Sequence, residues 1–413
     1  MKIIIAGGGI AGLTTALSLH KKGFHVEVFE SAREIKPLGV GINLLPHAIR
    51  VLSALGLEER IRAIAVATRE LAYYNKFGQK IWQEPRGKFA GYKWSQYSIH
   101  RGTLQVLLME AVKEAIGIGK IHTGHSLLSF QNGEEKGSAV FLDKKNNCEL
   151  VVEFDLLVGA DGIHSAVRKQ MYPHEKEPPF SGIMLHRGTS LSKPFLTGSS
   201  MIMAGSARQK FVAYPISPSV DKNGNQLINW IADLPIGDGM SAERDWNRKS
   251  DKQKILSFYR NWKFDWLDIP SLIESSDAIY EYPMCDRDPL ERWTWGRVTL
   301  TGDAAHPMYP IGSNGGSQAI LDAECLAECL LNDADLFRAL QHYEQIRLPA
   351  TGKIVLQNRQ MGPEQVMQIV EDRAPDGFSN LHDIITQEEL EDIASRYKQI
   401  AGFEKDELNR KLI

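Results

Sequence analysis

The chain has 413 residues, of which 43% are hydrophobic and 24% are charged, a composition that excludes disordered, collagen-like and disulfide-scaffold proteins. Its 48 Lys and Arg residues are balanced by 51 Asp and Glu residues, so we expect no nucleic-acid partner. The four cysteines, Cys148, Cys285, Cys325 and Cys329, are too few for a disulfide framework and form no CxxC pair, which favours a reducing, cytoplasmic setting.

The chain opens with a strand, a glycine-rich turn and a helix. Lys2 to Ala6 is a β-branched run that leads directly into Gly7-Gly8-Gly9-Ile10-Ala11-Gly12, a GxGxxG motif. In this motif Gly7 permits the turn, Gly9 lets a pyrophosphate approach the backbone, and Gly12 permits close packing of the helix on the strand. The N-terminus of the helix then faces the anion. The pattern predicts a bound dinucleotide.

A second predicted strand, Val26 to Glu30, completes a β-α-β unit. Glu30 ends this strand about 20 residues after the glycines, where a carboxylate accepts hydrogen bonds from an adenosine ribose and repels a 2′-phosphate. The motif by itself does not separate NAD from FAD. Three consecutive glycines inside the uncharged stretch from Ile3 to Leu19 argue against a signal peptide or membrane helix, and we expect no membrane partner.

Two further strand-end motifs follow downstream. Residues 154–168 form a buried run that leads to Asp161, and residues 297–307 lead in the same way to Asp303, followed by Pro310 and a glycine-rich start of a helix that contains Asp322. Three strand-end sites indicate one extended ligand, whereas an NAD-dependent dehydrogenase needs only the first. The alternative reading makes Asp161 and Asp303 helix caps or turn formers.

Residues 179–282 have a different sequence pattern. Short runs in which apolar and polar residues alternate are separated by clusters of Gly, Pro, Ser and Asn. This pattern predicts an antiparallel sheet, which with residues 76–97 forms a second domain facing the ligand. Our candidates for the floor of a substrate pocket are Met184, His186, Arg187, Met203, Tyr214 and Trp230. Alternation does not say which face of each strand meets the pocket, and core packing is the alternative for most of them.

The C-terminal part is predicted to be helical. Thr386-Gln387-Glu388-Glu389 is a capping box, and Gly402 ends the helix that it starts. The predicted fold is therefore α/β, with a discontinuous Rossmann-like domain over 1–75, 98–178 and 283–350, a sheet domain over 76–97 and 179–282, and C-terminal helices over 351–413.

The three motifs together resemble the FAD-dependent aromatic hydroxylases of the p-hydroxybenzoate hydroxylase fold, and within them the hydroxylases of N-methylated phenazine carboxylates. The resemblance covers almost the whole chain. Its matching stretches are 39–43, 96–102, 159–168, 213–217, 245–248, 286–290 and 302–321. His186 departs from it, because a Trp is expected before Arg187, and this leaves the substrate open.

The resemblance implies that the motifs and the loops beside them bind FAD. The implied cofactor residues are Gly7, Gly9, Ile10, Ala11, Gly12, Glu30, Ser31, Val40, Gly41, Arg101, Leu127, Asp161, Asp303, Pro310, Gly315 and Gly316. Among them, Asp303 would accept hydrogen bonds from the ribityl chain, and the amides at Gly315 and Gly316 would stabilise reduced flavin. Catalysis would be centred on the flavin, with Arg187 and Tyr214 as candidate participants. We expect no metal, since neither His164 nor His306 has ligand spacing to a second His.

The implied reaction is that of a monooxygenase. NAD(P)H would reduce FAD in transient contact near Asp161, O2 would form a C4a-hydroperoxide, and one oxygen atom would pass to a planar aromatic or heteroaromatic substrate whose carboxylate or phenolate pairs with Arg187. Rival readings are a flavin halogenase, whose Trp-x-Trp-x-Ile-Pro signature the chain lacks, another FAD-dependent oxidoreductase with a non-phenazine substrate, and a flavin-bound interaction protein without turnover. The sequence leaves the oligomeric state open.

Overall fold

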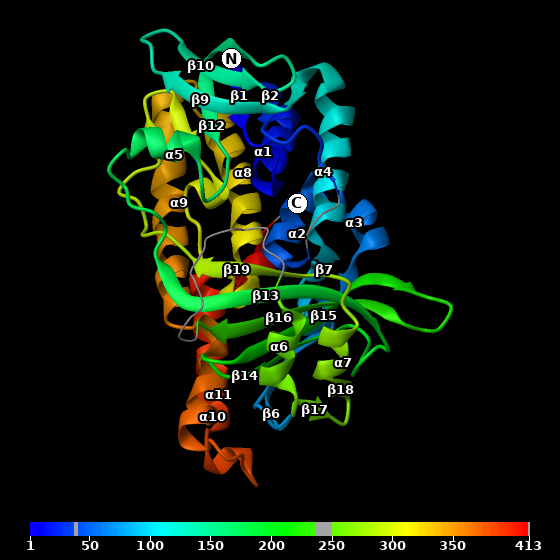
Figure 1. Cartoon of the computed structure of the whole chain (residues 1–413). Helices are drawn as coiled ribbons and strands as arrows, with labels where there is room; N and C mark the ends of the chain where they lie inside the picture. The colour runs from blue at the N-terminus through cyan, green and yellow to red at the C-terminus, as the bar shows by residue number, and fades with distance from the viewer. Residues whose placement is uncertain (37–39, 237–249, 412–413) are drawn as a thin grey trace.

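A computed structural model describes residues 1–36, 40–236 and 250–411. Two units are visible in Figure 1: an α/β unit that contains both the blue N-terminal and the yellow C-terminal-half elements, and a sheet unit drawn mainly in green. Residue 39 and residues 245–248, which belong to the stretches of resemblance, lie outside the described residues. No helix in the described part of the chain has the length and apolarity needed to cross a bilayer.

The α/β unit is built on a six-stranded sheet with the order β20-β21-β12-β1-β2-β8. Its strands are β20 (Thr294–Trp295), β21 (Val298–Leu300), β12 (Leu156–Gly159), β1 (Lys2–Ala6), β2 (His25–Glu30) and β8 (Ile121–Thr123). All neighbours pair in parallel except β20 and β21. Ala6 pairs with Gly159, and Gly159 pairs with Leu300. The three motif strands therefore end side by side, as the sequence predicts.

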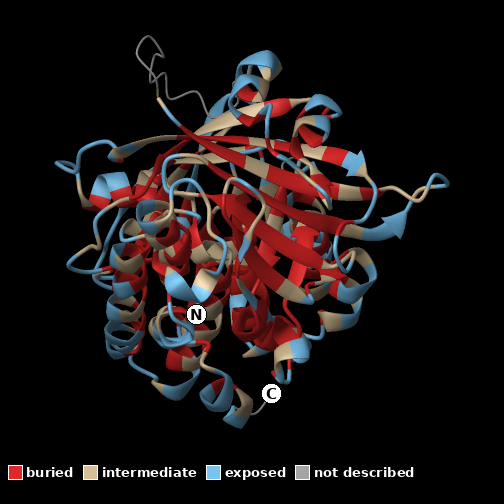
Figure 2. Cartoon of the chain, turned by 90° about the horizontal axis from the view of Figure 1, so that it is seen from below, coloured by how far each residue is buried: buried red, intermediate tan, exposed pale blue. Residues whose placement is uncertain are grey.

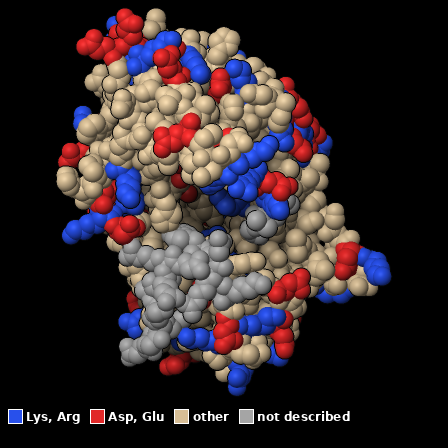
Figure 3. Space-filling view, turned by 45° about the horizontal axis from the view of Figure 1, so that its top comes forward, with Lys and Arg blue, Asp and Glu red and all other residues tan. Residues whose placement is uncertain are grey.

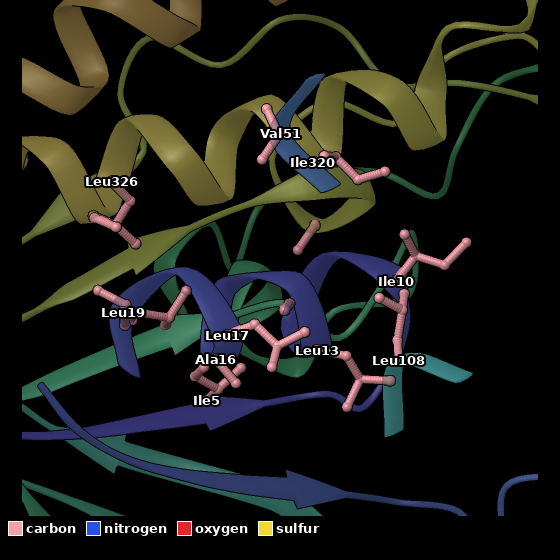
Figure 4. Packing of buried hydrophobic residues seen from close by; sticks show 14 of the residues in the cluster. Ile5, Ile10, Leu13, Ala16, Leu17, Leu19, Val51, Leu108, Ile320 and Leu326 are labelled. Atoms are coloured by element: carbon pink, nitrogen blue, oxygen red, sulfur yellow. The ribbon is translucent and has the colours of Figure 1, made fainter. Parts of the chain in front are cut away.

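Helices cover this sheet. They are α1 (Ile10–Lys21), α4 (Arg101–Ile116), α5 (Ala166–Met171), α8 (Gly315–Asn332) and α9 (Leu336–Arg359). Figure 4 shows Leu13, Leu17 and Leu19 of α1 in one buried cluster with Ile5 of β1 and with Ile320 and Leu326 of α8. Because α1 is apolar on several sides, it packs on the sheet and on α8 at once, and this holds the N-termini of both helices in place.

Smaller elements complete the α/β unit. A three-stranded antiparallel sheet of β9 (His125–Gln131), β10 (Gly137–Asp143) and β11 (Cys148–Phe154) lies beside the parallel sheet and was not predicted. A second small sheet joins β3 (Gly41–Leu44), β7 (Tyr97–His100) and β4 (Val66–Ala67). Two helices, α2 (Pro46–Ala54) and α3 (Glu58–Ile64), stand next to it.

The sheet unit has seven strands in the order β19-β13-β16-β15-β14-β5-β6. They are β19 (Ile279–Cys285), β13 (Phe180–Ser192), β16 (Gln226–Pro235), β15 (Lys210–Val220), β14 (Ser200–Gly205), β5 (Glu70–Tyr74) and β6 (Lys80–Pro85). Neighbours are antiparallel except β14 and β5. The sheet takes in β5 and the end of β19, which the expected ranges assign to the other domain, because both strands pair along their length with sheet neighbours.

Both faces of this sheet are covered, as the red strands of Figure 2 show. On one face lie α6 (Lys252–Tyr259) and α7 (Ile269–Glu274), with the short strands β17 (Lys263–Phe264) and β18 (Leu267–Asp268). The other face meets the α/β unit and the C-terminal helices α10 (Gln365–Arg373) and α11 (Gln387–Ile400), which α12 (Lys405–Arg410) follows. The capping box at Thr386 and Glu389 is confirmed.

Candidate active site

A first cavity of about 440 Å³ opens at the carboxyl ends of β1, β2 and β12. Its lining includes these residues expected at the cofactor: Gly7, Gly9, Glu30, Ser31, Leu127 and Asp161. Its lining also includes five residues that the sequence reasoning did not single out for the cofactor: Phe29, Gln105, His125, Ser126 and His164. Ile10, Ala11 and Gly12 do not line it, although they form the first turn of α1 directly beside it.

The three motif glycines differ in what surrounds them. Gly7 has φ +112°, and a Cβ there would lie 2.3 Å from the carbonyl oxygen of Ala160. A Cβ on Gly12 would lie 2.0 Å from the carbonyl oxygen of Gly7, so this glycine permits the contact between helix and strand. At Gly9 a Cβ would meet nothing within 4 Å. Gly9 therefore leaves open space at the N-terminus of α1, where an anion is favoured.

Both acids of this cavity also stabilise the turns that carry them. Glu30 accepts hydrogen bonds from the amides of Gly8 and Ala32, each at 2.6 Å. Asp161 accepts from the Ser165 hydroxyl at 2.5 Å and from the Ala166 amide at 2.7 Å, at the start of α5. Burial raises the pKa of Asp161, while these donors act against the increase. Asp161 therefore also makes the contacts of a capping residue, which was the alternative role for it.

A second cavity of about 230 Å³ lies between the α/β unit and the sheet unit. From the α/β unit it is lined by these expected residues: Gly41, Arg101, Asp303, Pro310, Gly315 and Gly316. Val40 does not line it, but its carbonyl oxygen accepts the amide hydrogen of Arg101 at 2.9 Å. A Cβ on Gly41 would lie 2.6 Å from the Tyr214 ring, so the two units meet there too closely for any side chain.

Asp303 and the start of α8 present complementary groups to the second cavity. Asp303 is exposed, and within the described ranges no hydrogen bond or ion pair of its carboxylate is found. The first turn of α8 contains no acidic residue, and Asn314 provides no side-chain cap. The amides at Gly315 and Gly316 are thus available to a ligand together with the positive end of the helix dipole.

A buried ionic network supports the turn that carries Asp303. The Asp322 carboxylate accepts from the Gly302 amide at 3.0 Å, from His306 Nε2 at 2.5 Å and from Arg347 Nε at 2.7 Å. Burial by itself would raise the pKa of Asp322, but His306 and Arg347 hold it well below its ordinary value. His306 therefore has a structural role.

The sheet face of the second cavity consists of alternate residues on four strands. Arg187 of β13, Tyr214 of β15 and Met203 of β14 line it, as expected, and so do Leu185, Met201, Val212 and Ile231. Arg187 Nε is buried and has no hydrogen-bond partner among the described residues. Burial raises the pKa of Tyr214, and nearby Arg187 lowers it, so the phenol remains protonated at neutral pH.

The expectation that His186 and Trp230 form the pocket floor is wrong, and Met184 is likewise absent from the cavity lining. His186 is buried, lies 2.9 Å from the Ser250 hydroxyl, and has a pKa that burial lowers to about 4. Trp230 is fully buried, and its Nε1 donates to Ser190 and Ser276. Successive residues of a strand point to opposite faces, so residues next to Arg187 and Ile231 project toward α6 and α7 instead.

Three charged residues of the second cavity were missed by the sequence analysis. Lys210 Nζ lies 2.8 Å from Asp233 and 2.6 Å from Glu364, and all three line the cavity. Lys210 comes from β15, Asp233 from β16, and Glu364 from the 3-10 turn Gly362–Glu364 just before α10. Among the described residues no group of His, Cys, Asp and Glu could hold a metal ion.

Comparison with known proteins agrees with this geometry. The model of the FAD binding domain family matches residues 1–358. The chain is 48% identical to a phenazine 1,6-dicarboxylic acid hydroxylase from Lysobacter antibioticus over 362 residues, which is 86% of this chain and 89% of that protein. The chain belongs to the FAD-dependent aromatic hydroxylases. It is an FAD-dependent monooxygenase.

Two further proteins show weaker similarity to the chain. A 3-hydroxybenzoate 6-hydroxylase from Aquipseudomonas alcaligenes is 31% identical over 86% of this chain and 87% of that protein. The structure of Klebsiella pneumoniae HpxO complexed with FAD and uric acid superposes with a TM-score of 0.75 at 22% identity, covering 98% of this chain and 96% of that one. This likeness confirms the fold.

The two cavities of this hydroxylase fit FAD. The open space at Gly9 suits a pyrophosphate, and the free carboxylate of Asp303 suits the hydroxyls of a ribityl chain. The N-terminus of α8 in the second cavity suits the electron-rich edge of a reduced isoalloxazine ring.

Changing Asp303 to Ala is expected to weaken FAD binding by about 1.5 to 3 kcal/mol, the range for hydrogen bonds to a charged group. The fold should persist, because the exposed carboxylate makes no contact that the turn needs. The dissociation constant of FAD, measured by flavin fluorescence, checks this, with Asp303→Asn as an intermediate variant. Unaltered FAD affinity in the Ala variant would show that the Asp303 carboxylate does not bind FAD.

Proposed function

We propose that this monooxygenase hydroxylates a planar aromatic or heteroaromatic carboxylate, with phenazine carboxylates as its substrate class, and that it uses NAD(P)H and O2. The observation that carries the proposal is Arg187, a half-buried cation that lines the second cavity together with Asp303 and the start of α8, and whose buried Nε has no hydrogen-bond partner among the described residues. A guanidinium in such a position binds a carboxylate through charge-assisted hydrogen bonds.

The walls of the second cavity suit a flat, largely apolar molecule. Met201, Met203, Val212 and Ile231 present apolar side chains from the sheet, beside the polar and charged side chains of Arg187, Tyr214, Lys210 and Asp233, a combination typical of pockets that orient a flat ligand through a few polar contacts. The names of two relatives agree, since a phenazine dicarboxylic acid and a hydroxybenzoate are both aromatic carboxylates. Phenazine is preferred because that relative is 48% identical to this chain.

Bound FAD, reduced by NAD(P)H, supplies the activation of O2 from which one oxygen atom reaches the aromatic ring. The protein binds and orients the cofactor and the substrate. In the proposal the glycines of the first motif and Asp303 hold the cofactor, Arg187 fixes the substrate carboxylate, and the apolar wall of the sheet excludes water from the reacting face. Tyr214 stays protonated, and its hydroxyl serves as a hydrogen-bond donor to the substrate.

The reductant is proposed to bind transiently beside the cofactor. Figure 3 shows Lys and Arg side chains gathered beside a hollow on one face of the molecule. A local positive potential raises the encounter rate of anions, and both NAD(P)H and an aromatic carboxylate are anions. Substrate-stimulated oxidation of NADH and of NADPH, compared at low and at high ionic strength, tests this part of the proposal.

Phenazine-1-carboxylate is expected to stimulate NAD(P)H oxidation and to be hydroxylated with little release of hydrogen peroxide. Phenazine-1-carboxamide, a neutral compound of the same shape, is expected to bind more weakly. Arg187→Ala should weaken binding of the acid by about 1.5 to 3 kcal/mol and leave the amide nearly unaffected. Oxidation that no aromatic acid stimulates would contradict the proposal and favour a flavin-bound interaction protein.

A further inference from the structure

Lys210, Asp233 and Glu364 form a buried charged cluster in the wall of the substrate cavity, and the proposed function does not use it. Their side chains are 10%, 4% and 2% exposed, yet each lines the same cavity as Arg187. The Tyr259 hydroxyl donates to the backbone carbonyl oxygens of both Lys210 and Asp233, at 2.8 and 3.2 Å. The two strands that carry the cluster are thus held together behind it.

The cluster has hydrogen-bonding capacity left over. The Lys210 ammonium has three N–H groups and gives two of them to Asp233 Oδ2 and Glu364 Oε2. Asp233 Oδ1 is buried without a hydrogen-bond partner among the described residues. Two carboxyl groups face a single ammonium, so the cluster has an excess of acceptors over donors. A buried acceptor without a partner is costly, and a donor on a ligand removes that cost.

The strand register places the cluster at a distance from Arg187. Arg187 pairs with Ile231, and Ile231 pairs with Val212, two residues from Lys210 on the same strand. At about 4.8 Å per strand and about 3.3 Å per residue, the backbones of Arg187 and Lys210 lie about 10 Å apart across the sheet and about 7 Å apart along it. A fused three-ring acid held by its carboxylate at Arg187 therefore extends toward the cluster.

We propose that Lys210, Asp233 and Glu364 form a second polar subsite that accepts a hydrogen bond from a hydroxyl or ring N–H of the substrate and disfavours a second carboxylate. This inference rests on the proposed function, because it takes the substrate to be an aromatic acid anchored at Arg187. It assigns the enzyme a monocarboxylate with a donor at its far end. A symmetrical dicarboxylate would bring a second carboxylate, and no donor, against the two buried carboxyl groups of the cluster.

The test measures binding to the oxidised holoenzyme without NAD(P)H, by perturbation of the flavin absorbance. The probes are 6-hydroxyphenazine-1-carboxylate, its 6-methoxy analogue, which has no donor, and phenazine-1,6-dicarboxylate. The hydroxy acid is expected to bind about tenfold more tightly than the methoxy acid, and the dicarboxylate is expected to bind most weakly. Equal affinity for the hydroxy and methoxy acids would overturn the proposal.

Asp233→Asn keeps the shape of the side chain and removes its charge. It is expected to reduce the hydroxy-to-methoxy affinity ratio several-fold and to relieve the penalty on the dicarboxylate. A ratio measured within one variant does not respond to a general loss of structure, and bound FAD reports folding. If this variant does not fold, Glu364→Gln tests the same penalty by removing the other carboxylate. Unchanged ratios in the folded variant would show that the cluster is structural only.

A failure of the proposed function would look different. In that case none of the phenazine probes binds, and the comparison is made with 4′-hydroxybiphenyl-3-carboxylate and 4′-methoxybiphenyl-3-carboxylate, which are aromatic acids of similar length without a phenazine ring. Preference for the hydroxyl compound that Asp233→Asn removes would support the subsite without the phenazine substrate, and equal binding of the two biphenyl acids would overturn it.

Discussion

Gly9→Val is expected to give a folded protein that has lost most of its FAD. The backbone at Gly9 has φ −78°, which valine adopts without strain, and a Cβ there meets no protein atom within 4 Å. The added side chain therefore costs the fold little, but it occupies the space beside the N-terminus of α1 where the pyrophosphate approaches. The ratio of flavin to protein absorbance after purification checks this, together with the FAD dissociation constant.

Gly12→Ala is the matched control. It adds a single methyl group three residues away, but it is expected to destabilise the fold rather than to block the pyrophosphate. Its Cβ would lie 2.0 Å from a backbone oxygen, so helix and strand must separate, at a cost of about 1 to 3 kcal/mol or more. The thermal midpoint of the FAD-free protein should fall for Gly12→Ala and hardly change for Gly9→Val. Full retention of FAD by Gly9→Val would show that the first motif does not form part of the cofactor site.

The strand-end motifs were accessible to sequence reasoning for a physical reason. Each joins a short buried run to a glycine or an acid, and parallel strands bring such ends to one edge of a sheet. Asp161 and Asp303, although 142 positions apart in the sequence, could therefore be expected near one ligand. Both lie at the edge where β12 and β21 end, each lining one of the two cavities.

The substrate face could not be predicted in the same way. Both faces of the seven-stranded sheet are buried, so most residues on either face are apolar, and the alternation of the sequence does not indicate which face lines the cavity. Arg187 and His186 are neighbours, and only the packing of α6 and α7 on one face decides which of them meets the substrate. Trp230 was misplaced for this reason, since a large aromatic suits a core as well as a pocket.

The charged cluster at Lys210 shows a second limit of the sequence. Its acids lie 23 and 154 positions from Lys210 in the sequence. Their contact depends on the register of β15 with β16 and on the docking of α10, and neither follows from local patterns. Helix α11, in contrast, was predictable from its capping box. Its Tyr397 hydroxyl contacts Asn314 and the carbonyl oxygen of Ile311 beside the second cavity, and no local signal indicates those contacts.

Asp322→Asn is expected to lower the free energy of unfolding by about 3 to 5 kcal/mol, the cost of removing one partner from a buried ion pair. Asp322 is completely buried, and without its charge Arg347 and His306 lose their anionic partner. Because the same carboxylate accepts the Gly302 amide, the turn that presents Asp303 should loosen, and FAD affinity should fall as well. Denaturant unfolding in excess FAD measures the first effect, and a flavin titration measures the second.

Glu328→Gln on the same helix is the control. Its partner Lys22 is 2.7 Å away, but the two side chains are 45% and 28% exposed, so the loss should stay within about 1 kcal/mol. The folded pKa of Asp322 lies below its unfolded value of about 4, so its stabilisation is present above that pH and is lost as the pH falls toward the folded pKa. The difference in stability between wild type and Asp322→Asn should therefore shrink below about pH 4. A difference that stays the same on acidification, or one no larger than that of Glu328→Gln, would mean that the buried charge does not support the turn.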